Sequence, residues 1–134
     1  MLANRSMVLA AVMPELDYPD VTAATEWLVR VFGFRVRLRI ANHRAHLEYG
    51  GAALAVREGL VGPPAGHGVM VRVEDVDAHY AHALAAGASV AGPPRAFPYG
   101  ERQYNAVDLA GHRWTFSQSV ADVDPADWGG EAFE

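Results

Sequence analysis

The chain contains an internal repeat, and a repeated unit restricts the possible folds more than any single motif does. The spacing of apolar residues predicts an amphipathic helix over residues 21–32, with an aspartate before it and Gly33 at its end. A second helix is predicted to begin at Asp75 or Asp77 and to end in the same way at Gly87. The two halves therefore place a capped helix at equivalent positions.

Strand-like segments surround the two helices in the same order. One apolar run precedes each helix and three strand patterns follow it, so each half has the order βαβββ. The predicted fold class is α+β, with two βαβββ modules. The expected strands are 7–13, 34–40, 46–49 and 52–57 in the first half, and 69–73, 88–90, 103–109 and 112–119 in the second.

The 134 residues suit two small modules that share a core, because neither would bury enough apolar surface alone. We assign residues 1–60 to the first module and 67–121 to the second. The stretch between them, 61–66, is rich in glycine and proline and is predicted to be a linker. Residues 122–134 form an acidic tail.

Composition excludes several classes of function. The chain has no cysteine, which excludes disulfides, thiolate metal sites and cysteine nucleophiles, and we expect a cytoplasmic location. There is no long apolar run, so no membrane span is predicted. The net charge of −5 comes from the five acidic residues of the tail, and the basic residues are spread along the chain. We therefore expect no nucleic-acid partner.

Arginine alternates with apolar residues along the second predicted strand, 34–40. Arg35, Arg37 and Arg39 alternate with Val36 and Leu38, which predicts a half-exposed strand with its arginines on one face. These arginines fit either a solvated face or an anion site.

Three segments, 20–34, 73–77 and 99–116, together resemble the vicinal oxygen chelate superfamily, which contains glyoxalase I, bleomycin-resistance proteins and extradiol dioxygenases. The last segment includes Asp108-Leu109-Ala110-Gly111-His112-Arg113-Trp114, which is similar to the Asp-Pro-x-Gly-x-x-Trp ending of the family, with leucine in place of proline. The resemblance covers residues 7–119 and is strongest to the glyoxalase/bleomycin-resistance branch.

The resemblance implies a curved mixed sheet, or two half-barrels, around a cleft for a small molecule. In the enzymes of the family it also implies a divalent metal, held by four histidine, glutamate or glutamine side chains. The corresponding positions are Met13, His46, Gly68 and Thr115, of which only His46 could bind a metal. We therefore expect no cofactor. If a divalent metal is bound, His46 and His67 are the expected ligands.

Strand alternation predicts which side chains line the cleft. His46 and Glu48 alternate with Leu47, and Thr115 alternates with Trp114, which we expect in the core. An amphipathic aromatic residue can pack against an apolar ligand and also orient it. The residues predicted to bind ligand are His46, Glu48, Tyr104, Thr115, Ser117 and Met13.

Three functions agree with these features. The leading hypothesis is a metal-independent protein that captures a small, partly apolar ligand in the cleft. The second is a divalent-metal-dependent lyase, isomerase or dioxygenase, so catalysis is left open. The third is a structural or regulatory dimer without a ligand. A homodimer is expected because each module presents an open sheet.

Overall fold

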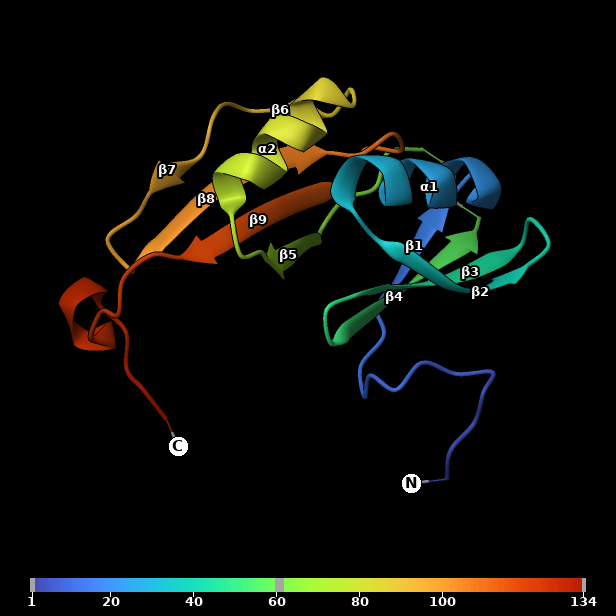
Figure 1. Cartoon of the computed structure of the whole chain (residues 1–134), viewed down its shortest axis with the longest axis horizontal. Helices are drawn as coiled ribbons and strands as arrows, with labels where there is room; N and C mark the ends of the chain where they lie inside the picture. Colours follow the sequence, from blue (N-terminus) through green and yellow to red (C-terminus); the bar gives the residue numbers. More distant parts are fainter. Residues whose placement is uncertain (1, 60–61, 134) are drawn as a thin grey trace. The chain divides into compact units, whose positions relative to one another are not determined.

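The computed structural model describes residues 2–59 and 62–133, which form two compact units. Unit 1 comprises Met1–Ala65 and Leu109–Gly111, and unit 2 comprises Gly66–Asp108 and His112–Glu134. Each unit has a mixed sheet with a helix on one face (Figure 1). The predicted α+β class with two sheet modules is confirmed. The predicted linker at 61–66 begins outside the described residues.

Unit 1 has a four-stranded sheet with the strand order β1-β4-β3-β2. Strand β1 runs parallel to β4, and the other neighbours are antiparallel. The α-helix is followed directly by a π-helical segment, η1. The elements are β1 (Glu15–Tyr18), α1 (Val21–Trp27), η1 (Leu28–Phe32), β2 (Arg35–Ile40), β3 (Arg44–Tyr49) and β4 (Ala52–Glu58).

The helical segment of unit 1 has the boundaries that the sequence predicts. The side chain of Asp20 accepts a hydrogen bond from the backbone N–H of Ala23 at 3.1 Å, which satisfies one free donor of the first turn. Gly33 ends the segment with a φ of 86°, a left-handed conformation that glycine adopts without strain. The helix packs on β3 and β4.

The two faces of the first sheet differ in chemistry. The face under α1 is apolar, and Tyr18, Leu47 and Val56 on it are fully buried. We call the opposite face of each sheet its helix-free face. In unit 1 the residues that alternate onto it are Glu15, Asp17, Arg44, His46, Glu48, Ala53, Ala55 and Arg57.

The first predicted strand, at residues 7–13, is wrong. The strand is β1 and begins at Glu15. It pairs in parallel with β4, with Glu15 opposite Ala55. Since β4 begins at Ala52, the same register carried backwards brings Val12 level with its first residue. Residues 7–11 therefore lie beyond the end of their partner strand, and their apolar character cannot make them a strand.

Strand β2 has an irregularity that the alternation of arginines did not predict. Its pairing with β3 shifts between Val36 and Leu38, so that Arg37 is an extra residue. Arg35 lies opposite Glu48, whereas Arg39 lies opposite Ala45. Because positions 45 and 48 of β3 point to opposite faces, the three arginines do not share one face.

Unit 2 has a sheet with the order β5-β9-β8-β6, and β7 also pairs with β8. Strand β5 is parallel to β9, while β8 is antiparallel to β9. The helix α2 packs on β8 and β9 (Figure 1). The elements are β5 (Gly68–Arg72), α2 (Val76–Ala85), β6 (Ser89–Val90), β7 (Arg95–Ala96), β8 (Glu101–Val107), β9 (Arg113–Ser119) and the 3₁₀ helix η2 (Pro125–Trp128).

Aromatic side chains fill the core between α2 and its sheet. The rings of Trp114 and Phe116 are parallel within 5°, with centroids 6.1 Å apart, and Tyr104 stacks on Phe116 at 5.2 Å. All three are almost fully buried. The expectation that Trp114 lies in the core is therefore confirmed.

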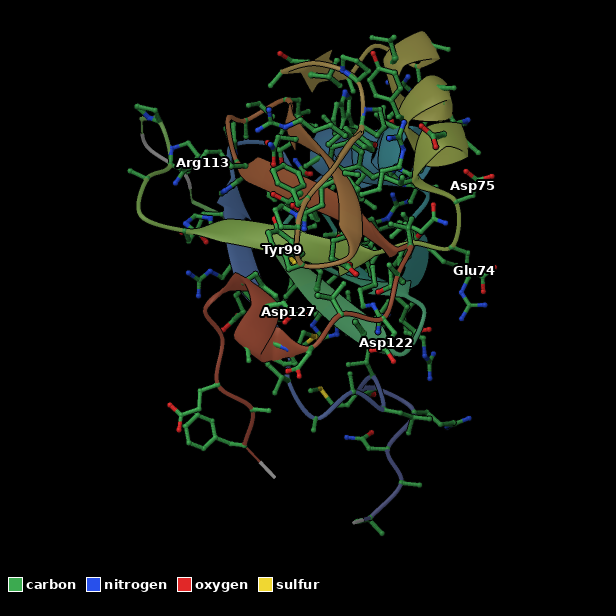
Figure 2. The ribbon with its side chains drawn as sticks, turned by 90° about the vertical axis from the view of Figure 1, so that its left-hand side faces the viewer. Glu74, Asp75, Tyr99, Arg113, Asp122 and Asp127 are labelled. Atoms are coloured by element: carbon green, nitrogen blue, oxygen red, sulfur yellow. The ribbon has the colours of Figure 1, made fainter. Side chains whose placement is uncertain are left out.

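The acidic tail has local structure. Figure 2 labels Asp127, on η2, and Tyr99, which precedes β8. The ring of Trp128 lies 5.2 Å from the ring of Tyr99, and Tyr99 stacks on Phe97 at 5.4 Å. The tail therefore packs on the rest of unit 2 through an aromatic contact.

Candidate functional site

Unit 2 contains a hollow of about 680 Å³ over its sheet. Seven of the twelve lining residues alternate onto the helix-free face, four lie between them on the strands, and Ala91 follows β6. This volume is in the range of small-molecule sites in proteins. The lining residues are Gly68, Val69, Met70, Ser89, Val90, Ala91, Asn105, Ala106, Val107, Arg113, Trp114 and Thr115.

The hollow combines apolar and polar groups. Met70 and Val107 are 65% and 39% exposed, so each offers apolar surface to a ligand. On neighbouring strands the hydroxyl of Thr115 donates to the Oδ1 of Asn105 at 2.7 Å. The guanidinium-bearing Arg113, labelled in Figure 2, also lines the hollow. Such a lining can pack an apolar body and also hydrogen-bond its polar atoms.

A row of hydrogen-bonded polar groups continues along the helix-free face. The hydroxyl of Ser117 donates to Glu101 at 2.7 Å and accepts from the amide of Gln103 at 3.0 Å. The Tyr99 hydroxyl donates to the amide oxygen of Gln103 at 3.0 Å. Ser117 and Gln103 are buried. Their hydrogen bonds fix the side chains of this row in place.

Glu101 is ionised at neutral pH. Hydrogen bonds from Ser119 and Ser117, together with the charge of Arg72, lower the pKa of its carboxyl group and outweigh the opposing effect of burial. Arg72 also donates to the hydroxyl of Ser119 at 2.7 Å. The carboxylate is therefore held by neighbouring donors.

Tyr104 lies on the other face of this sheet. It is opposite Phe116 in the β8–β9 pairing, whereas Thr115 is opposite Asn105. Its hydroxyl lies 2.6 Å from Nδ1 of His79 on α2, and the ring is 1% exposed. The expectation that Tyr104 points to the same side as Thr115 and Ser117 is therefore wrong.

In unit 1 the most buried polar group of the helix-free face is His46, which is 4% exposed. Its Nε2 accepts a hydrogen bond from Nε of Arg44 at 2.9 Å. Arg44 also donates to Glu15 at 2.7 Å. Burial and the positive charge of Arg44 lower the pKa of His46, with Glu15 acting in the opposite direction, so the imidazole is neutral at pH 7.

The other predicted residues of unit 1 lie near a smaller hollow of about 330 Å³. Glu48 lines it and forms ion pairs with Arg35 at 2.8 Å and Arg37 at 3.4 Å. Residues 8–10 line the same hollow. Met13 is half-buried and precedes β1, and the parallel register carried backwards brings it level with Ala53, another lining residue.

The side chains at the four family metal positions do not fit a divalent cation. Met13 offers a thioether, Gly68 offers no side chain, and Thr115 offers a hydroxyl that is already bonded to Asn105. His67 has its Nε2 3.0 Å from Nδ1 of His112. Within residues 2–59 and 62–133, no three histidines or carboxylates gather in a metal-binding arrangement.

Asn105, Met70 and Val107 are lining residues that the sequence reasoning missed. The available signal was alternation along β8, where Gln103, Asn105 and Val107 share a face. Which face of β8 lies at the hollow depends on the register between β8 and β9. That register is a tertiary feature, so alternation along β8 alone could not identify the face.

The fold defines a class of protein with two sheet modules, each with a helix on one face, and with a hollow over the sheet of unit 2. Residues 12–116 match the model of the Glyoxalase/Bleomycin resistance protein/Dioxygenase superfamily, and the chain belongs to this family. Among solved structures it is similar to TioX from Micromonospora sp. ML1, with 42% identity and a TM-score of 0.70 over 80% of this chain and 96% of that one.

Two more distant structures share the fold. A lactoylglutathione lyase from Agrobacterium tumefaciens is 20% identical, with a TM-score of 0.65 over 81% of this chain and 92% of that one. FosX, a fosfomycin resistance protein from Listeria monocytogenes, is 16% identical, with a TM-score of 0.68 over 84% of this chain and 94% of that one. No curated protein matches the chain. Among the described helices, none is long and apolar enough to span a membrane.

Proposed function

We propose that the chain is a binding protein that captures a small, partly apolar molecule without a metal ion. The observation that carries this proposal is the hollow of about 680 Å³ in unit 2, whose lining combines apolar side chains with the Asn105–Thr115 pair. The proposed partners are the small molecule and a second copy of the chain, in the cytoplasm.

The lining indicates the kind of ligand. Met70 and Val107 would contact an apolar part, and the burial of such surface is the main source of affinity for small molecules. The hydroxyl of Thr115 and the amide of Asn105 would orient the polar part. Met70 can adopt several rotamers, so this surface suits ligands of differing shape.

A metal-dependent lyase, isomerase or dioxygenase is the alternative. It would need a set of nitrogen and oxygen ligands around one cation. The side chains of Met13, Gly68 and Thr115 do not supply such a set, which is why metal-independent capture is preferred.

A thermal-shift screen tests the proposal. Small molecules that combine a ring or alkyl body with a hydrogen-bonding group are added to the purified protein, because a ligand of the folded state raises the melting temperature. Hits are then titrated calorimetrically against the wild type, Thr115→Val and Asn105→Ala. We expect each variant to weaken binding by about 5- to 30-fold, as loss of one hydrogen bond does.

Glu26→Gln serves as the matched control, because Glu26 is an exposed residue of α1 in the other unit. It should bind the hits as the wild type does. Hits that bind Thr115→Val and Asn105→Ala as tightly as the wild type would contradict the proposed site, and a screen without any hit would contradict capture itself.

A further inference from the structure

The imidazole of His46 is buried with one nitrogen satisfied and one without a partner. Its Nε2 lies 2.9 Å from Nε of Arg44. Its Nδ1 is fully buried and has no hydrogen-bond partner among the described residues. A guanidinium only donates hydrogen bonds, so Nε2 must be the acceptor and carries no proton. The proton of the neutral ring is therefore on Nδ1.

Neighbouring charges keep Arg44 in this position. Its guanidinium also donates to Glu15 at 2.7 Å, so one side chain bridges a carboxylate and an imidazole. Arg57, opposite Arg44 on β4, is held by Asp17 at 2.6 Å and by Glu15 at 3.6 Å. Glu48, the next residue of β3 on this face, pairs with arginines of β2. The charged groups around His46 are therefore already paired with each other.

An unmatched buried N–H is rare in folded proteins and calls for an explanation. We propose that Arg44 is the positioning residue that holds His46 as the neutral Nδ1–H tautomer, and that this tautomer keeps His46 from serving as a metal ligand. The exclusion of metal bears on the metal-independent capture proposed above, and the tautomer does not rest on that proposal.

The hydrogen bond from Arg44 also prevents His46 from binding a metal ion. A metal needs an imidazole lone pair. The lone pair on Nε2 accepts from Arg44, and Nδ1 carries the proton. A cation at Nε2 would have to displace a guanidinium that is itself positively charged. His46 is thus the one side chain suited to metal among the four family positions, and Arg44 prevents it from serving.

The tautomer is measured by long-range ¹H–¹⁵N correlation spectra of protein with labelled histidine at pH 7.5. Such spectra distinguish a protonated from an unprotonated ring nitrogen. His46→Gln identifies the signals of His46 among the six histidines. We expect an unprotonated Nε2 and a protonated Nδ1. A His46 with its proton on Nε2 would overturn the inference.

Two arginine variants test the positioning role. Arg44→Met should move His46 towards the Nε2–H tautomer, which a histidine side chain prefers in water. Arg57→Met removes another arginine of the same face, whose Nε donates to Asp17 and not to His46. It should leave the tautomer unchanged. An equal response to both variants would contradict the role of Arg44. The wild-type spectrum decides the tautomer even where a variant does not fold.

An added metal ion tests the exclusion of metal. Zinc chloride at one equivalent should leave the His46 signals of the wild type unchanged. A shift of the Nε2 signal would overturn the exclusion of metal, while the tautomer would stand separately.

Discussion

The indole nitrogen of Trp114 lies 3.1 Å from Oδ2 of Asp108, and both residues are buried. The other oxygen of Asp108 accepts the backbone N–H of His112 at 3.0 Å. One carboxylate therefore joins the turn between β8 and β9 to the largest side chain of the core.

Replacing this tryptophan should destabilise the protein. Trp114→Ala empties a large core site and removes a donor from Asp108, so we expect the free energy of unfolding in urea to fall by about 3–5 kcal/mol. Trp114→Phe retains most of the ring packing and should cost less. A loss below about 1 kcal/mol for Trp114→Ala would show that the site is not a packed core.

His46 should make stability depend on pH near neutrality. Burial and Arg44 lower its pKa in the folded state below the ordinary value of 6.5, so the unfolded chain takes up this proton at a higher pH than the folded protein. The contribution is fully present above pH 6.5. It is lost as the pH falls from 6.5 towards the folded pKa, and the free energy of unfolding decreases over this interval.

His46→Gln removes this titrating group and should flatten the pH dependence in the same interval. Urea unfolding between about pH 5.5 and 7.5 measures the effect. The lowered pKa of Glu101, whose ordinary value is 4.5, affects stability only below that pH, so the two effects are separated. Equal slopes for the wild type and His46→Gln would contradict the lowered pKa.

Gly100 should not tolerate a side chain. Its φ is 84°, and an added Cβ would meet the carbonyl oxygen of Ala121. Gly100→Ala should therefore lower the free energy of unfolding by about 1–3 kcal/mol. Gly51→Ala is the control, because its Cβ would lie in open space. Similar stabilities for the two variants would show that the segments around Gly100 and Ala121 are not closely packed.

Tyr104 should contribute to stability and not to binding. Tyr104→Phe removes the hydroxyl that lies 2.6 Å from His79, and we expect a cost of about 0.5–1.5 kcal/mol in thermal or urea unfolding. Ligands found by the thermal-shift screen should bind this variant as they bind the wild type. A tenfold loss of affinity would place the ligand on the helix side of the sheet.

The chain should form a homodimer. Each unit presents an open sheet, and in unit 1 Val36 and Ile40 of β2 are 42% and 50% exposed, apolar surface that a second copy of the chain can cover. Sedimentation velocity at micromolar concentration measures the mass. Monomer alone over the whole concentration range would contradict this expectation.

Features determined by neighbouring residues could be read from the sequence. The helical segment 21–32, its aspartate cap and Gly33 agree with the structure because capping and periodicity act within a few residues. The second helix, Val76–Ala85, begins after Asp75 for the same reason. The positions of Thr115 and Trp114 on opposite faces of β9 also follow from local alternation.

Features determined by a partner strand could not be read in this way. Residues 7–13 are apolar enough for a strand, but β4 is too short to pair with all of them. Tyr104 was assigned to the wrong face because its orientation depends on the register of β8 against β9. The role of Arg44 at His46 was missed because the sequence does not show which neighbour the Arg44 side chain contacts. Residues two apart on one face of a strand can bond to each other or to residues of the adjacent strands.

The extra residue in β2 also affects how this strand can change in length. Val36 and Leu38 pair with Leu47 and His46, which are consecutive on β3. Deleting Arg37 would therefore join two segments of β2 that are already in register with consecutive residues of β3. No other residue of β2 would change face. A deletion at any other position of the strand would turn the residues between it and the irregularity to the opposite side. Position 37 is thus where the length of this strand can vary by one residue at the lowest cost.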